Sequence, residues 1–238
     1  MKTFRLFSLF LVVVVLYPLQ NHAQGSVTLN PTKDNTIYNN LGQAHTDSLS
    51  NGAGSYLVAG NVNTINFNRR ALIKFDLSSL ATTVTVDSVV LKIHAQQNAQ
   101  HDTGSRFFTL HKLKANWGEG TSDAGSAPGT GAAATTGDAT WKWTFYTTSL
   151  WSTYGGYFES TASATTDTLT GDLLNVDVYW RSTLSGNSQM KTDVQNWVKY
   201  GTTNNGWLIK GVEGTLRTAT MFYSRESSYQ PVLTVYYH

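Results

Sequence analysis

Stretches that alternate apolar and polar residues are the strongest constraint on the fold of this chain. In residues 84–95, Val89, Leu91 and Ile93 fall on one face, and Lys92 and His94 fall on the other. A period of two predicts a strand with one buried and one solvated face. Further short strands are predicted at 27–29, 36–38, 56–59, 69–75, 106–113, 173–179, 207–212, 219–223 and 232–237. Short strands at this spacing, without βαβ alternation, predict an all-β fold, a β-sandwich of jelly-roll type.

One short helix is predicted over residues 193–200. Thr192 is its expected N-cap, and Gly201 follows its end. One face of this segment carries the apolar residues Met190, Val194, Trp197 and Val198. We expect the helix to cover an open end of the sandwich.

The first 23 residues have the pattern of a secretory signal peptide. Lys2 and Arg5 precede an apolar run over residues 6–17, and a polar segment ends at Ala23. This run is too short to span a bilayer comfortably. We therefore expect residues 24–238 to form a single exported domain, in the periplasm, on the cell surface or outside a bacterial cell. The chain has no cysteine, so its core must form without disulfides.

The charge of the chain gives no basis for binding nucleic acid. The full chain has 17 basic and 15 acidic side chains. Removing residues 1–23 takes away Lys2 and Arg5 but no acid, which leaves a formal net charge of zero. Binding through bulk positive charge is therefore not expected. Local basic clusters remain at Arg69, Arg70 and Lys74 and at Arg106, Lys112 and Lys114.

Several separated motifs occur in a fixed order. They are Arg-Arg-Ala-Leu-Ile-Lys-Phe-Asp-Leu-Ser-Ser-Leu at 69–80, Trp-Gly-Glu-Gly-Thr at 117–121, Ala-Thr-Trp at 139–141, Trp-Ser-Thr-Tyr-Gly-Gly at 151–156, Val-Gln-Asn-Trp at 194–197, Asn-Asn-Gly-Trp at 204–207 and Phe-Tyr-Ser-Arg-Glu at 222–226. The ordered set resembles the DNRLRE domains, which are grouped with carbohydrate-binding module family 96. The resemblance implies a secreted jelly-roll module that binds polysaccharides, alginate among them, and that is often attached to catalytic domains.

Sugar binding requires aromatic faces for pyranose rings and cations where the glycan carries carboxylates. The segment 141–158 contains eight aromatic residues in a polar background. Four of its rings lie between or beside the motifs and are candidate sugar contacts, namely Trp143, Tyr146, Tyr154 and Tyr157. Candidate cations are Arg69, Lys112 and Lys114. The tryptophans inside the motifs, Trp141, Trp151, Trp197 and Trp207, are expected in the core.

Charged residues within the motifs have a second interpretation. Arg70, Arg225 and Glu226 are expected to form an internal ion-pair network that ties the last strands to residues 69–75. No cofactor is required by the sequence. A structural calcium ion remains an option, with oxygen ligands drawn from the strand-end and loop acids Asp34, Asp76, Glu119 and Asp138. The chain has no spaced acidic loop of the EF-hand type, and no cysteine and only scattered histidines for zinc.

Three function classes follow. The first is a non-catalytic module with a polysaccharide as its partner. The second is a structural or adhesive protein that contacts other cell-surface proteins. The third is a jelly-roll polysaccharide lyase, which Gln43-Ala44-His45 resembles in one element, although the other blocks of that lyase family are absent. A patch of exposed aromatics across a sheet face or groove would favour the first class, and a flat apolar patch the second.

Overall fold

The computed structural model describes residues 24–40, 48–64 and 66–238. The predicted signal peptide and Gln43-Ala44-His45 lie outside these residues. The strands are β1 (Gly25–Leu29), β2 (Pro31–Tyr38), β3 (Leu49–Ser50), β4 (Tyr56–Asn61), β5 (Asn68–Phe75), β6 (Val86–Asn98), β7 (Thr109–Lys112), β8 (Ala132–Ala133), β9 (Trp143–Phe145), β10 (Ser149–Leu150), β11 (Ala164–Thr165), β12 (Val176–Arg181), β13 (Trp207–Lys210), β14 (Thr220–Tyr223) and β15 (Val232–Tyr237).

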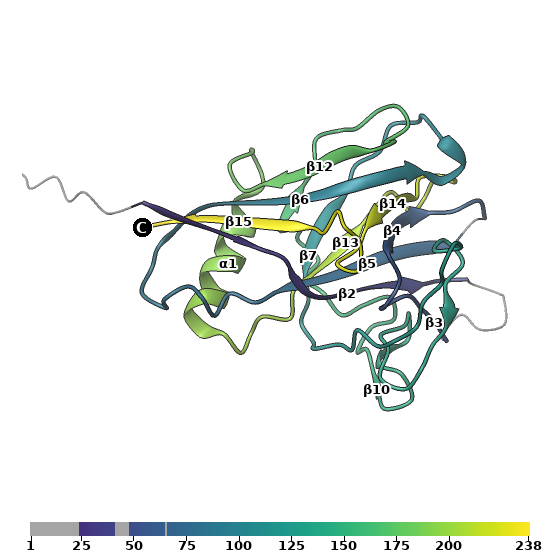
Figure 1. The fold of residues 1–238 in the computed structure, drawn as a ribbon, viewed down its shortest axis with the longest axis horizontal. Coiled ribbons are helices and arrows are strands. Elements are labelled where there is room, and N and C mark those ends of the chain that lie inside the picture. The colour runs from purple at the N-terminus through teal and green to yellow at the C-terminus, as the bar shows by residue number, and fades with distance from the viewer. Residues whose placement is uncertain (1–23, 41–47, 65) are drawn as a thin grey trace, which may run out of the picture.

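The strands form two antiparallel layers, which confirms the predicted all-β sandwich (Figure 1). The first sheet has the order β1-β15-β6-β14-β4, with β12 also paired to β6. The second sheet has the order β5-β13-β7-β11, with β2 also paired to β5. β4 joins the two layers, because residues 56–59 pair with β14 whereas Gly60 and Asn61 pair with β5. The sheet therefore curls from one layer into the other through a single strand.

The main core lies between the two layers. Val89, Leu91 and Ile93 of β6 are fully buried, as the alternation predicts. Ala71 and Ile73 of β5 face them from the second sheet as members of the same cluster. Full burial of each larger aliphatic side chain contributes about 1.5–3 kcal/mol. Strand periodicity thus accounts for the part of the fold that holds the two layers together.

The helix α1 (Ser188–Tyr200) begins five residues before the predicted start at residue 193. Asn187 precedes it, and the Asn187 amide donates to the backbone carbonyls of Thr165 and Arg181, so it fixes the helix start through tertiary contacts. The predicted apolar face is buried, and Gly201 donates its N–H to Trp197 O as the expected C-cap. α1 packs against β6 and closes one end of the sandwich (Figure 1).

A second core covers the outer face of the second sheet. Leu72 of β5 and Leu208 of β13 point out of the sandwich and pack against the segment 113–158, which we call the covering segment. Trp117 and Trp151 of this segment are buried there. Of the four tryptophans expected in the core, Trp151, Trp197 and Trp207 are buried, whereas Trp141 is half-buried at the margin of the second core. Many of the aromatic side chains in residues 141–158 therefore pack against the second core.

Candidate functional site

Four aromatic side chains gather on the outer face of the first sheet, and we call them the aromatic platform: Tyr56, His94, Tyr223 and Tyr229. The Tyr223 ring centroid lies 5.3 Å from that of Tyr56 and 4.9 Å from that of Tyr229. The His94 ring stacks on Tyr229 at 4.9 Å with an interplanar angle of 17°. Tyr229 is 55% exposed. The platform therefore offers ring faces and edges to solvent at one place.

Strand alternation explains why these rings point outward. Tyr56 opens β4 just before the fully buried Leu57, and Tyr223 closes β14 just after the fully buried Phe222. Tyr56 and Tyr223 are direct partners in the ladder between β4 and β14, so their side chains share a face. Neither tyrosine was predicted as a site residue, because the neighbouring Leu57 and Phe222 mark both strands as core strands. The period-two phase of these two strands was the signal that could have found them.

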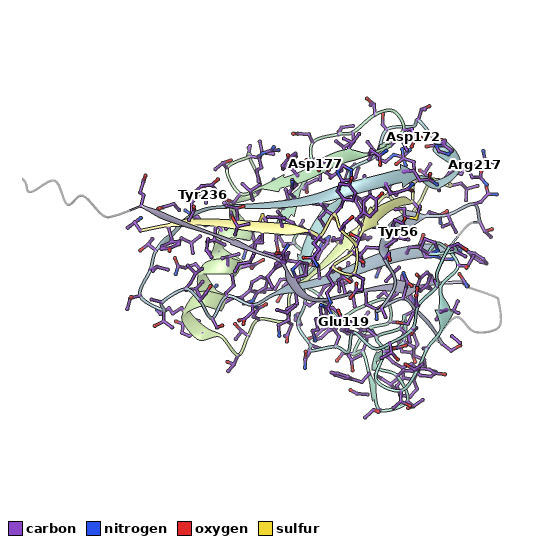
Figure 2. All side chains as sticks on the ribbon, in the orientation of Figure 1. Tyr56, Glu119, Asp172, Asp177, Arg217 and Tyr236 are labelled. Carbon is purple, nitrogen blue, oxygen red and sulfur yellow. The ribbon has the colours of Figure 1, made fainter. Side chains whose placement is uncertain are left out.

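Polar and charged side chains flank the platform on β6 and β12, among them Asp177, which is labelled in Figure 2. His94 Nδ1 lies 2.7 Å from Asp177 Oδ1, which orients the imidazole ring. Lys92 Nζ lies 3.7 Å from Asp177 Oδ2, and the Arg181 guanidinium lies 4.0 Å from the ring centroid of Tyr179. Partial burial would raise the pKa of Asp177, but the His94 hydrogen bond and the Lys92 charge outweigh it and lower that pKa. Asp177 is thus held as a carboxylate beside the rings.

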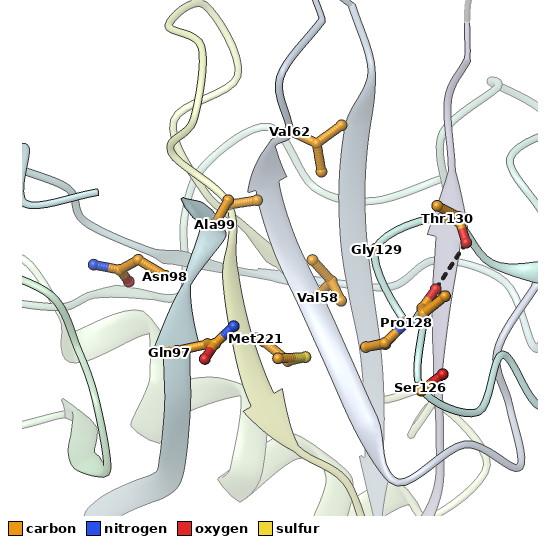
Figure 3. Close-up of a pocket in the computed structure, with 12 residues that line it drawn as sticks. Val58, Val62, Gln97, Asn98, Ala99, Ser126, Pro128, Gly129, Thr130 and Met221 are labelled. Carbon is orange, nitrogen blue, oxygen red and sulfur yellow. Dashed lines mark hydrogen bonds between the residues drawn. The ribbon is translucent and has the colours of Figure 1, made fainter. Parts of the chain in front are cut away.

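A cavity adjoins the platform along the same strands (Figure 3). Its floor is formed by Val58 of β4, Gln97 of β6 and Met221 of β14, and the loop 126–130 forms the opposite wall. The volume is about 200 Å³. Val58 and Met221 lie two residues from the platform tyrosines, a spacing of about 7 Å along a strand. Platform and cavity are therefore neighbouring parts of one surface.

A second cavity of about 490 Å³ continues the first, and we call the two together the groove. They share Val62, Ala99, Gly129 and Thr130 as lining residues. Arg69 fixes the wall of the groove, because its Nε donates to Gly129 O at 2.7 Å while the guanidinium lies over the Tyr38 ring at 4.9 Å. Arg69 is 2% exposed and also lines the second cavity, so its contact with sugar stays a prediction.

The sequence-predicted aromatic contacts lie elsewhere, on the covering segment. Trp143 and Tyr146 are half-buried and pack edge to face at 6.1 Å, whereas Tyr154 is 57% exposed. Lys142 Nζ lies 5.9 Å from the Trp143 ring centroid and 6.0 Å from that of Tyr154. We call these four residues the second aromatic cluster. Tyr157 instead packs against the second core.

The predicted lysines have acidic partners. Lys112 Nζ lies 3.6 Å from the buried Asp193 of α1. Lys114 Nζ lies 3.5 Å from Glu159 and 4.8 Å from the Tyr157 ring centroid. Both lysines stay partly exposed. Within the described part of the chain, Lys114 and Tyr157 are thus a predicted cation and a predicted aromatic residue that lie in contact.

The expected ion-pair network is divided in two. Arg70 pairs with Glu213, with Nε to Oε1 at 2.6 Å and Nη2 to Oε2 at 2.8 Å. Arg70 therefore does not pair with Glu226, in contrast to the single network expected from the sequence. Arg225 Nε lies 2.6 Å from Glu119 Oε1 and 3.0 Å from Glu226 Oε1. Glu213 was missed because it lies in the loop after β13, three residues beyond the ladder partner of Arg70.

Three carboxylates meet around Arg225, and we call them the carboxylate cluster: Asp34, Glu119 and Glu226. One oxygen of each lies within 4.8 Å of the others. Asp34 is fully buried. Burial, and then the nearby charge of Glu226, raise the pKa of Asp34 well above its usual value. Burial also raises the pKa of Glu226.

The four acids predicted as calcium ligands are therefore only partly brought together. Asp34 and Glu119 meet, and Glu226 joins them from the expected ion-pair network. Asp76 lies apart on the surface, where it accepts hydrogen bonds from Ser78. Asp138 is buried, and its carboxylate accepts hydrogen bonds from Thr121, Ser122 and Thr135. Its oxygens are thus satisfied within the covering segment.

The family model of carbohydrate-binding module family 96 matches residues 25–153, more than half of the chain. The chain therefore belongs to carbohydrate-binding module family 96, as its motifs indicate. A search of curated proteins gave no match. Across residues 24–40, 48–64 and 66–238, no helix has the length and apolar character needed to span a membrane.

Proposed function

We propose that this protein is a secreted, non-catalytic polysaccharide-binding module whose glycan chain crosses the aromatic platform and enters the groove. The observation that carries the proposal is the set of adjoining rings Tyr56, His94, Tyr223 and Tyr229 beside the groove on one sheet face. Membership of a carbohydrate-binding family supports it.

The chemistry of the platform suits a sugar chain. Aromatic faces pack against the C–H groups of a pyranose ring. Amide groups donate hydrogen bonds to its hydroxyls and accept them, whereas carboxylates only accept. Gln97 of the groove and Asp177 beside the platform are such groups. An elongated surface of this kind fits several consecutive sugar units.

We further propose an acidic glycan, with alginate as the first ligand to test. Lys92 and Arg181 lie on the platform side of β6 and β12 and provide positive charge for uronate carboxylates. Asp177 Oδ2 lies 3.7 Å from Lys92 Nζ and limits this charge, so a neutral glycan is the comparison that matters.

Affinity electrophoresis of residues 24–238 in gels with alginate, pectin, xylan or no polysaccharide tests the proposal. We expect Tyr229→Ala to weaken retention about tenfold, because loss of one exposed ring removes about 1–1.5 kcal/mol of stacking. Tyr154→Ala is the matched control, since it removes an equally exposed tyrosine from the second aromatic cluster. Its retention should equal that of the unmodified chain.

Other outcomes contradict the proposal in identifiable ways. If Tyr154→Ala abolishes retention and Tyr229→Ala does not, the glycan-binding site lies at the second aromatic cluster and not at the platform. A rise in ultraviolet absorbance from unsaturated uronates during incubation with glycan would make the protein a lyase. If no glycan retards the chain, a structural or adhesive role becomes the better interpretation.

A further inference from the structure

The carboxylate cluster draws its members from three distant parts of the chain. Asp34 lies in β2, Glu119 in the covering segment and Glu226 just after β14. They are linked directly, because Asp34 N donates to Glu119 Oε1 at 2.8 Å and Arg225 N donates to Asp34 Oδ2 at 2.8 Å. The cluster is therefore a built junction and not a chance meeting of surface acids.

The positive charge at this junction does not match the negative charge. Arg225 is the cation in contact with Glu119 and Glu226. Lys33 lies next in sequence to Asp34, but its ammonium group donates to Asn116 Oδ1 and Trp117 O. Glu119 and Glu226 thus share one guanidinium, Asp34 accepts from the backbone N–H of Arg225, and the Lys33 charge acts on Glu119 from beside the cluster. Three carboxylates face two cations.

One oxygen at the junction lacks a partner altogether. Asp34 is 0% exposed, and its Oδ1 has no hydrogen-bond donor. Buried polar atoms are normally paired, and an unpaired buried carboxylate oxygen is costly. Asp34 is fixed by the β2 ladder, so it cannot turn to solvent to relieve this. The geometry calls for a positive group that the described residues do not supply.

We propose that Asp34, Glu119 and Glu226 bind a calcium ion. All three ligands are carboxylates, and Ca²⁺ prefers oxygen ligands in flexible geometry with high coordination numbers. Mg²⁺ demands a near-ideal octahedron, and zinc sites favour histidine and cysteine, neither of which belongs to this cluster. The ion would satisfy Asp34 Oδ1 and balance the excess negative charge.

The position of the ion gives it a second consequence, which rests on the proposed function. Glu226 lies in the loop that follows β14 and also carries Tyr229, the most exposed member of the platform. Within this loop Gln230 Nε2 donates to Arg225 O at 2.5 Å, so the loop is tied back to the junction. Calcium would therefore hold Tyr229 in place for glycan binding.

Isothermal titration calorimetry of CaCl₂ into chelator-treated protein, residues 24–238, tests the site without any glycan. We expect one ion per chain with a Kd of about 1 mM or tighter, the range of extracellular calcium modules. Asp34→Asn and Glu226→Gln should each weaken binding by about tenfold or more, because each removes one charged ligand. Asp76→Asn is the control, since it removes the same charge at an exposed turn, and it should bind as the unmodified chain does.

Two results would overturn the site. One is no binding heat and no rise in melting temperature with CaCl₂ at about ten times the expected Kd, where mass action requires a stabilisation. The other is an unchanged calcium affinity in Glu226→Gln. This result would overturn the site even if Asp34→Asn fails to fold. Glycan retention is then compared in calcium and in chelator. Equal retention despite calcium binding would refute the link to Tyr229 alone, and absent retention with intact calcium binding would refute the proposed function alone.

Discussion

Arg69 and Arg70 are neighbours in sequence that serve opposite faces of β5. Successive side chains of a strand point to opposite faces. Arg69 turns toward Tyr38 and holds the wall of the groove through Gly129. Arg70 turns to the second core, where its Nη1 donates to Gly155 O at 2.7 Å and its guanidinium lies 4.5 Å from the Trp141 ring centroid. Two identical residues thus have unrelated roles.

The pair between Arg70 and Glu213 makes a prediction at this scale. Arg70→Ala leaves Glu213, whose side chain is only 14% exposed, without its bidentate partner. Removing one member of such a pair costs about 3 kcal/mol. Urea unfolding at neutral pH measures this loss. Lys191→Ala on the exposed face of α1 is the control and should change the unfolding free energy by less than about 0.5 kcal/mol; an equally small effect of Arg70→Ala would contradict the prediction.

Among the elements, the covering segment is the one that the sequence could not place. The long strands β6 and β15 were predictable because their residues alternate between positions buried in a single core and positions nearer solvent. The covering segment has no such period. It is held by irregular backbone bonds, such as Ala139 N to Gly118 O and Tyr146 N to Asp138 O, which composition does not encode.

The aromatic platform could not be predicted from the sequence for a related reason. Its rings come from three strands and a loop, and their proximity depends on the pairing of β4 with β14 and of β14 with β6. The predicted sugar contacts instead lie in residues 141–158, where aromatic residues are most frequent, and many of these residues pack against the second core. Density of aromatic residues indicates packing as readily as binding.

Gly120 makes a prediction for the covering segment as an element. It has φ of +79°, and a Cβ there would lie 1.3 Å from Asp138 Oδ1. Because Asp138 is buried and hydrogen-bonded on both oxygens, Gly120→Ala should destabilise the protein by about 2–4 kcal/mol through strain and overpacking together. Chemical denaturation measures the change.

Gly125→Ala separates the two causes. Gly125 also has positive φ, +55°, but nothing lies within 4 Å of its Cβ position. For this variant we expect the free energy of unfolding to fall by only about 1 kcal/mol, the cost of backbone strain alone. Equal losses in both variants would mean that contact with Asp138 does not limit this position.

At the scale of the whole molecule, the two layers are completed from both ends of the chain. The family match covers residues 25–153, but β4, β5 and β6 each pair with strands that follow residue 153. Main-core residues such as Trp207, Phe222 and Leu233 also come from this later part. The matched region therefore lacks strands that β4, β5 and β6 need as hydrogen-bonding partners.

A fragment of residues 24–153 should consequently fail to fold. Unpaired edges of β5 and β6 and an uncovered core favour aggregation over a native state. Thermal unfolding followed by circular dichroism should show no cooperative transition for this fragment and one transition for residues 24–238. Cooperative melting of the fragment together with glycan retention would refute the single-domain interpretation.

The pairing of β1 with β15 determines how the molecule would respond to mechanical load. The two strands are antiparallel, with Gly25 opposite Tyr237, so the start of β1 and the end of β15 lie at the same corner of the sheet (Figure 1). Tension applied between those ends would open the ladder one hydrogen bond at a time and not shear all of them together. β1 would peel away under a small force, while the groove, on strands further into the sheet, would stay closed.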